Sequence, residues 1–132
     1  MSYKISHFVL VLVLFSSCKK IETPNEQSKL LFGAWKYISS SGGFSGGGVS
    51  EIGFVDKGVE FTNKGQRFDY NNGKKEEGNN YSFETKKSIF SGQDEVMISY
   101  KNSFSQSFKI SNDTLYLSDE VNDGYNYIYL KR

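Results

Sequence analysis

The stretch "NDTLYLSDEVNDGYNYIYLK", residues 112–131, contains two short segments in which apolar or aromatic residues recur at every second position. In the first segment, Leu115 and Leu117 fall on one face. In the second, three tyrosines form one row: Tyr125, Tyr127 and Tyr129. A period of two is typical of a β-strand, because successive side chains of a strand point to opposite faces. Asp123-Gly124 lies between the segments and tolerates the positive φ of a tight turn, so the stretch predicts a hairpin.

The same alternation extends back through the chain to residue 35. It is present in these further segments: "WKYISS" (35–40), "GVEFT" (58–62), "QRFDY" (66–70), "NYSFE" (80–84), "EVMISY" (95–100) and "SFSQSFKI" (103–110). Turn residues separate the segments, most clearly Asn71-Asn72-Gly73. About eight short strands without a long helical period predict an all-β fold, an antiparallel up-and-down meander that forms a closed barrel or a sandwich. We expect the barrel, because closure pairs the edge strands, and about eight strands enclose just enough room for side chains or one small ligand.

Residues 1–17 read "MSYKISHFVLVLVLFSS" and have the layout of a secretory signal. Lys4 supplies a positive charge, an apolar run follows from Phe8 to Phe15, and small residues come next. The apolar run is about half as long as a membrane-spanning helix requires. The segment therefore predicts a signal peptide that is removed from the mature protein.

Cys18 directly follows this segment, and "LFSSC" resembles a bacterial lipobox. Such processing attaches a diacylglycerol to the thiol, cuts before the cysteine and acylates the new amine. Cys18 is the only cysteine of the chain, and an unpaired cysteine in an exported protein needs an explanation. A free thiol and an intermolecular disulfide are the alternatives. The lipid anchor is the prediction, and several acyl chains on one residue would give durable membrane attachment.

This interpretation sets the expected domain organisation and location. Residues 18–29 form a flexible tether, whose end, "EQSKLLFG", makes one short helical turn that plugs a barrel end, and residues 30–132 form the folded domain. Lys19 follows the cysteine, and the absence of Asp there favours the outer membrane over the inner one. The periplasmic and the cell-surface face both stay open.

The composition of the mature part limits its chemistry. The chain has 16 Lys+Arg and 15 Asp+Glu, and Lys4 is the only one of these in residues 1–17, so the mature charge is 15 minus 15, or zero. A neutral chain argues against nucleic acid as a partner. The only histidine, His7, lies in the signal segment. Without histidine and with an acylated cysteine, Ser–His and Cys–His catalysis and zinc sites of Cys or His are excluded. We therefore expect neither an enzyme nor a cofactor.

Two polar stretches and a set of strand carboxylates have the composition of a binding or catalytic site. "SSSGGFSGGG", residues 39–48, lacks the following helix and the Gly-Lys-Ser/Thr ending of a phosphate loop, so it predicts a loop between two strands. "SDEVNDG", residues 118–124, is rich in oxygen ligands, but its spacing differs from a calcium-binding EF-hand and favours a hairpin turn. Three acidic residues within strands are expected to face outward: Glu60, Asp69 and Glu84.

The segment "LFGAWKYISS", with Gly33-Ala34-Trp35, resembles the G-x-W start of lipocalins. The likeness extends to the small lipocalin-like domains of bacterial lipoproteins and covers most of residues 30–132, including "VEFTNKGQRFDYNNGK" and "DTLYLSDEVNDGYNYIYLKR". The resemblance implies that Gly33 allows a tight start of the first strand and that Trp35 closes the barrel floor. It also implies a basic partner for the tryptophan at the end of the last strand, a place that Arg132 can take by cation–π contact.

Nine inward candidates could line a ligand cavity: Phe61, Phe68, Tyr70, Tyr81, Phe83, Ile98, Tyr100, Phe108 and Tyr127. The alternative is that the same side chains fill the barrel, and a one-residue shift of register would exchange the two rows of a strand. The leading hypothesis is a non-enzymatic, lipid-anchored envelope barrel that binds a small apolar or amphipathic ligand. The second is a structural or protein-interaction module of the envelope with a filled core, and the third is a hydrolase with two carboxylates about 5–10 Å apart.

Replacing Cys18 by Ser tests the anchor. Because the hydroxyl cannot form the thioether, we expect the variant to leave the membrane fraction or to stay unprocessed. Metabolic labelling with a fatty acid, followed by membrane fractionation, measures this. A Cys18→Ser variant that still carries labelled lipid would contradict the prediction.

Overall fold

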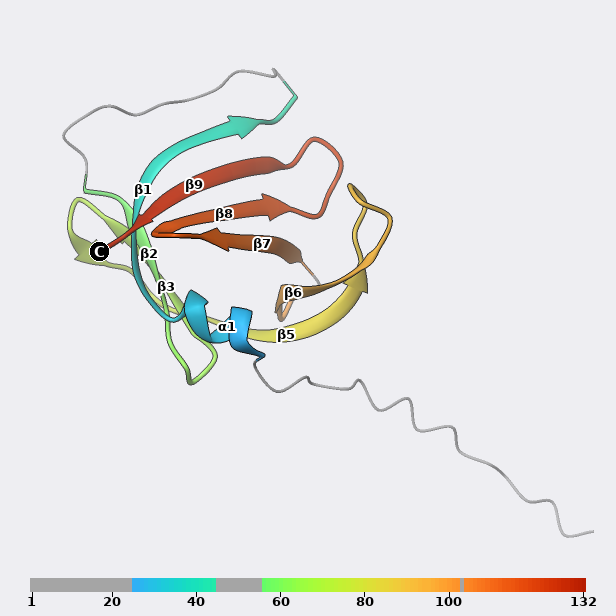
Figure 1. The fold of residues 1–132 in the computed structure, drawn as a ribbon. Coiled ribbons are helices and arrows are strands. Elements are labelled where there is room, and N and C mark those ends of the chain that lie inside the picture. The colour runs from blue at the N-terminus through green and yellow to red at the C-terminus, as the bar shows by residue number, and fades with distance from the viewer. Residues whose placement is uncertain (1–24, 45–55, 103) are drawn as a thin grey trace, which may run out of the picture.

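The computed structural model describes residues 25–44, 56–102 and 104–132 (Figure 1). Its elements are α1 (Glu26–Leu31), β1 (Gly33–Gly42), β2 (Gly58–Phe61), β3 (Gln66–Asn71), β4 (Lys74–Lys75), β5 (Asn79–Lys87), β6 (Asp94–Tyr100), β7 (Ser105–Ser111), β8 (Thr114–Asp119) and β9 (Tyr125–Lys131). The predicted signal peptide, Cys18 and the first part of the tether lie outside the described residues, as do residues 45–48 of the glycine-rich stretch. Within the described ranges, no helix has the length and apolar character needed to cross a bilayer.

The strands form one closed antiparallel barrel. The order around the sheet is β2-β1-β9-β8-β7-β6-β5-β3-β4, and a further pairing of β2 with β3 closes the ring. Eight strands make the barrel, and β4 is a short extra strand beyond β3. The predicted all-β meander is confirmed, and the closing pair selects a barrel over a sandwich. Asn72-Gly73 makes the predicted turn between β3 and β4, with φ values of 51° and 72°.

The short helix α1 closes the barrel on one side. The side chain of Asn25 accepts a hydrogen bond from the backbone N–H of Ser28 (2.8 Å), which satisfies one of the free donors at the start of the helix. The helix ends where Phe32 takes an extended conformation. Leu31 is fully buried in the core, so the helical turn predicted over "EQSKLLFG" is confirmed and packs against the barrel interior.

Trp35 is buried next to this helix, and its basic partner differs from the predicted one. The indole N–H donates to the carbonyl of Leu31 (2.8 Å). Lys131 places its Nζ 4.1 Å from the centre of the tryptophan rings and donates to the carbonyl of Phe32 (2.6 Å). The register explains the correction, because Lys131 pairs with Trp35 across β1 and β9 and shares its face. Arg132, the predicted partner, is one residue further along and forms an ion pair with Asp56.

Gly33 fits the role that the resemblance implies. Its φ of +116° is a conformation that residues with a side chain rarely adopt. A Cβ at this position would lie 3.0 Å from Nζ of Lys131. Glycine therefore allows both the start of β1 and the close approach of the lysine that covers Trp35.

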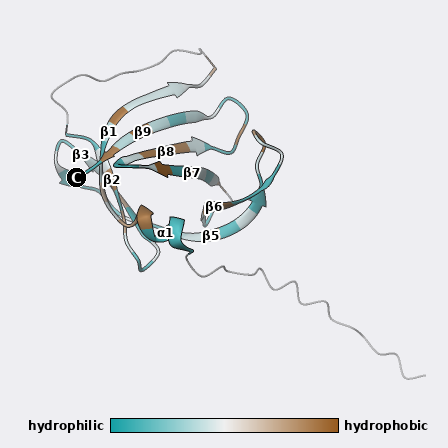
Figure 2. Ribbon diagram, viewed as in Figure 1, coloured by the Kyte–Doolittle hydropathy of each residue, from teal (hydrophilic) through white to brown (hydrophobic). Residues whose placement is uncertain are grey.

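Large apolar side chains fill the interior beside Trp35. The most completely buried of them are these: Leu31, Trp35, Val59, Phe61, Ile98, Leu115 and Leu117. The pairing of β8 with β9 puts Leu115 opposite Tyr129 and Leu117 opposite Tyr127, so the tyrosine row of β9 faces inward. Figure 2 shows hydrophobic and hydrophilic segments following one another along the strands, as expected when one face of each strand is buried.

Replacing Trp35 by Ala tests the floor of the barrel. Loss of a fully buried aromatic side chain should lower the free energy of unfolding by about 3–5 kcal/mol. Urea denaturation measures the loss. The control is Leu130→Ala on the outer face of β9, which is 43% exposed and should cost less than about 1 kcal/mol. A Trp35→Ala cost as small as that of the control would contradict the prediction.

Candidate functional site

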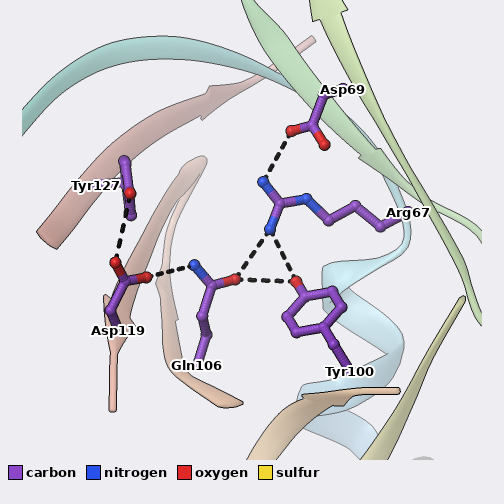
Figure 3. Close-up of polar contacts among 6 residues, drawn as sticks. All are labelled: Arg67, Asp69, Tyr100, Gln106, Asp119 and Tyr127. Atoms are coloured by element: carbon purple, nitrogen blue, oxygen red, sulfur yellow. Dashed lines mark hydrogen bonds and ion pairs between the residues drawn. The ribbon is translucent and has the colours of Figure 1, made fainter. Parts of the chain in front are cut away.

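A chain of polar side chains crosses the barrel interior from β9 to β3 (Figure 3). It begins at Asp119, which is buried and accepts hydrogen bonds from the backbone N–H of Tyr125 (3.1 Å) and from the hydroxyl of Tyr127 (3.4 Å). Its other carboxylate oxygen accepts from the amide of Gln106 (2.7 Å). A buried polar group is costly unless it is hydrogen-bonded, and Asp119 meets this condition on both oxygens.

Arg67 lies at the other end of this chain of polar side chains. The carbonyl oxygen of the Gln106 side chain accepts from Nη1 of Arg67 (3.0 Å) and from the hydroxyl of Tyr100 (2.9 Å). Nη1 of Arg67 also donates to the Tyr100 hydroxyl (2.8 Å), and Nη2 donates to Asp69 (2.8 Å). The guanidinium lies 5.8 Å from the ring centre of Phe61. Arg67 thus joins the polar chain to the apolar core.

The ionisation of Arg67 is set by these neighbours. Burial acts to lower its pKa, but Tyr100 and Asp69 outweigh that effect and raise the pKa above its ordinary value, so the guanidinium stays charged. Burial raises the pKa of Tyr100 in spite of the nearby cation, so its hydroxyl stays protonated. Nε of Arg67 is buried and has no hydrogen-bond partner among the described residues.

The barrel wall opens next to Arg67, at the seam between β3 and β5. These strands pair only at Gln66 with Asn80 and at Arg67 with Asn79, and β3 then pairs with β4 instead. A hollow of about 550 Å³ lies at this seam. Its lining residues are Arg67, Asp69, Gly78, Asn79, Asn80, Tyr100, Lys101, Asn102 and Phe104.

A second hollow of about 330 Å³ adjoins the first on the β5–β6 side. Its lining residues are Asn80, Tyr81, Ser82, Glu84, Lys86, Ser99, Tyr100 and Lys101. The two hollows share Asn80, Tyr100 and Lys101, and together they are named the polar groove. Both have volumes in the range of about 300–1,000 Å³ that is typical of small-molecule sites.

The structure separates the nine predicted lining residues into two groups. Seven face the interior: Phe61, Tyr81, Phe83, Ile98, Tyr100, Phe108 and Tyr127. Phe68 and Tyr70 lie on the outer face, contrary to expectation, where the Tyr70 hydroxyl donates to Glu60 (2.7 Å) and Lys75 lies 3.9 Å from the ring centre of Phe68. The register of β2 with β3 explains this, since it pairs buried Phe61 with Arg67 and so turns the alternate residues outward.

The inward aromatic residues mostly fill the barrel. Phe61, Phe83 and Ile98 belong to the buried core, with Phe108 packed against it. Of the nine candidates, Tyr81 and Tyr100 line the polar groove. The interior beside Trp35 is therefore a packed core, and the space for a ligand lies at the seam.

Sequence reasoning did not find the polar chain. It expected Asp69 to face solvent, whereas Asp69 shares the inward-facing row of β3 with Arg67. Glu60 and Glu84 lie on the outer face as expected, and form ion pairs with Lys75 (2.8 Å) and Lys86 (3.0 Å). The segment "QRFDY" has one polar row, Arg67 and Asp69, and one aromatic row, Phe68 and Tyr70. Hydrophobicity favours burial of the aromatic row, so the sequence alone predicts the wrong inward face for this strand.

The acidic stretch at residues 118–124 forms a hairpin connection and holds neighbouring segments. Asp119 belongs to the polar chain described above. Glu120 accepts hydrogen bonds from the hydroxyl of Ser88 (3.1 Å) and from the backbone N–H of Ile89 (2.9 Å). These two carboxylates therefore fasten the β8–β9 connection to the barrel interior and to the β5–β6 loop.

Comparison of the chain with protein-family models, with curated proteins and with solved structures gave no match. The eight-stranded antiparallel barrel is compatible with a lipocalin-like fold.

Tyr127 provides a test of the polar chain at alkaline pH. Burial, and next the carboxylate of Asp119, raise the pKa of Tyr127 to about 12. Because an unfolded tyrosine ionises near pH ~10, the buried tyrosine stabilises the fold fully below that pH, and this contribution is lost as the pH rises toward the folded-state pKa. We therefore expect the free energy of unfolding to fall less steeply above about pH 10 in Tyr127→Phe than in the wild type.

Urea denaturation at several alkaline pH values measures this difference. The matched control is Tyr116→Phe, on the outer face of β8, where the side chain is 42% exposed. The control should follow the wild-type slope. A Tyr127→Phe variant with the wild-type slope would show that this tyrosine is solvated in the folded protein.

Proposed function

We propose that this protein is a lipid-anchored lipoprotein of the cell envelope whose lipocalin-like barrel binds a small amphipathic ligand in the polar groove, without catalysing a reaction. The lipobox-like "LFSSC", the neutral charge of the mature part and the absence of histidine from it support the anchor and the non-enzymatic role. The outer membrane is the proposed location, because Lys19 follows the cysteine.

The polar groove is the observation on which the proposal of ligand binding rests. Its walls combine aromatic surface from Tyr100 and Phe104 with hydrogen-bonding side chains from β3 and β5. A site of this composition suits a molecule with both an apolar face and polar groups. The position at the seam also matters, because a ligand can enter there without displacing the packed core.

The arrangement of charge supports binding over hydrolysis. Asp69 pairs with Arg67 and Glu84 pairs with Lys86, so each carboxylate that lines the polar groove has a cation beside it. Both carboxylates are therefore engaged in ion pairs, and this arrangement favours a binding role over carboxylate-based hydrolysis.

The alternative is a structural or protein-interaction module of the envelope that takes no ligand. The packed interior beside Trp35 favours it, because side chains fill the space that a ligand occupies in a hollow barrel. The two functions differ in whether a small molecule accompanies the protein.

Native mass spectrometry of the lipoprotein, extracted from its own membranes in mild detergent, tests the proposal. We expect a bound small molecule in the wild type and its loss in Phe104→Ala, which removes aromatic surface from the polar groove. Tyr116→Ala, an aromatic truncation on the outer face of β8, is the control and should keep the molecule. Absence of any bound molecule from the wild type, or equal retention by both variants, would favour the interaction module.

A further inference from the structure

We propose that the ligand of the polar groove is a neutral carbohydrate, a disaccharide or longer, that stacks on Phe104 and is hydrogen-bonded by the side-chain amides of β5. This inference rests on the proposed ligand-binding function and names the chemical class of the ligand.

The first argument is charge. The cations and carboxylates on the groove walls neutralise one another, since Arg67 bonds Asp69 at 2.8 Å and Lys86 bonds Glu84 at 3.0 Å. Arg67 is further engaged by Tyr100 and Gln106. An anionic ligand would have to compete with these contacts, and a neutral ligand would not. Lys101, at the point shared by the two hollows, is the remaining charged side chain of the lining.

The second argument is hydrogen-bonding capacity. Asn79 and Asn80 are exposed at the start of β5, and each carboxamide offers two donors and one acceptor group. The oxygen of Asn102, another lining residue, accepts from the backbone N–H of Phe104 (3.2 Å), and its NH₂ group is a further donor at the groove wall. Ser82 adds a hydroxyl on the β5–β6 side. Neutral groups that both donate and accept match the hydroxyls of a sugar.

The third argument is the aromatic wall. The rings of Tyr100 and Phe104 are stacked, with centroids 5.8 Å apart and planes 26° from parallel. The stacking holds Phe104 against a tyrosine that is itself fixed by Arg67. The electron-rich face of an aromatic ring attracts weakly positive C–H groups, and one face of a pyranose presents a row of them. The flat aromatic surface can therefore contact the C–H groups of a sugar, while the neighbouring amides form hydrogen bonds with its hydroxyls.

The length of the groove sets the size of the ligand. The hollows of about 550 Å³ and about 330 Å³ share Asn80, Tyr100 and Lys101 in their linings, and the smaller one extends over the outer face of β5 and β6. The larger one lies beside Phe104 and the smaller one beside the serines of β5 and β6. One sugar ring stacked on Phe104 would leave the second hollow for a linked ring, so more than one unit is expected.

Titration of the mature lipoprotein with defined sugars tests the inference. The protein is held in a detergent that has no sugar headgroup. The neutral probes are maltose, cellobiose, lactose and N,N′-diacetylchitobiose, the charged probe is digalacturonate, and a capped Gly-Ser peptide is the non-sugar probe. Saturation-transfer NMR detects binding, and we expect at least one neutral disaccharide to bind more tightly than digalacturonate and the peptide.

Variants connect this binding to the groove. Asn79→Ala/Asn80→Ala should weaken the neutral sugar by about tenfold, as the loss of about two hydrogen bonds implies. Phe104→Ala should remove the saturation transfer to the stacked sugar ring. Lys101→Gln should change the affinity less than about threefold, because a neutral ligand gains little from this charge. Asn126→Ala, an exposed amide on β9 outside the groove, is the matched control and should bind like the wild type.

The possible results separate this inference from the proposed function. If no neutral disaccharide binds, if digalacturonate or the peptide binds as well, or if Lys101→Gln abolishes binding, the carbohydrate assignment is wrong. In that case, a small molecule retained in native mass spectrometry would leave the proposed ligand-binding function standing. The absence of both sugar binding and a retained molecule would overturn the two together.

Discussion

The pairing of β2 with both β1 and β3 is the constraint on which the rest of the structure depends. β2 has four residues, Gly58–Phe61, and its pairing on both sides turns an open meander into a closed ring. In a closed ring every strand has one row of side chains that faces inward. Residues that pair across neighbouring strands lie on the same face. Because Phe61 and Val59 are buried, their partners Arg67 and Asp69 in β3 face inward as well.

The inward position of Arg67 explains the chain of polar side chains. A buried guanidinium must be paired and hydrogen-bonded, because desolvation of an isolated charge costs several kcal/mol. Asp69, Tyr100 and Gln106 meet that need, and Gln106 in turn bonds Asp119. One charged residue thus fixes side chains from β3, β6, β7 and β8, and divides the interior into an apolar part beside Trp35 and a polar part.

The polar groove follows from a local feature of the same barrel. The tight turn at Asn72-Gly73 folds β4 onto the end of β3, so β5 pairs with β3 at only two positions. The wall is incomplete there, and the β6–β7 connection with Phe104 lies beside the opening. A packed core and a ligand site can therefore coexist in a small barrel, because the site lies at a seam in the wall and the core fills the interior.

The sequence by itself determined the fold class, the helical turn before β1 and the hairpin turns. These are local patterns of period and of residues that tolerate a positive φ, and they do not depend on distant partners. The sequence left open which row of each strand faces inward. It therefore placed Phe68 and Tyr70 inside, assigned the lysine's position beside Trp35 to Arg132, and missed the buried Arg67. Only the tertiary structure decided these points, because a strand's inward row is set by its register with neighbours far along the chain.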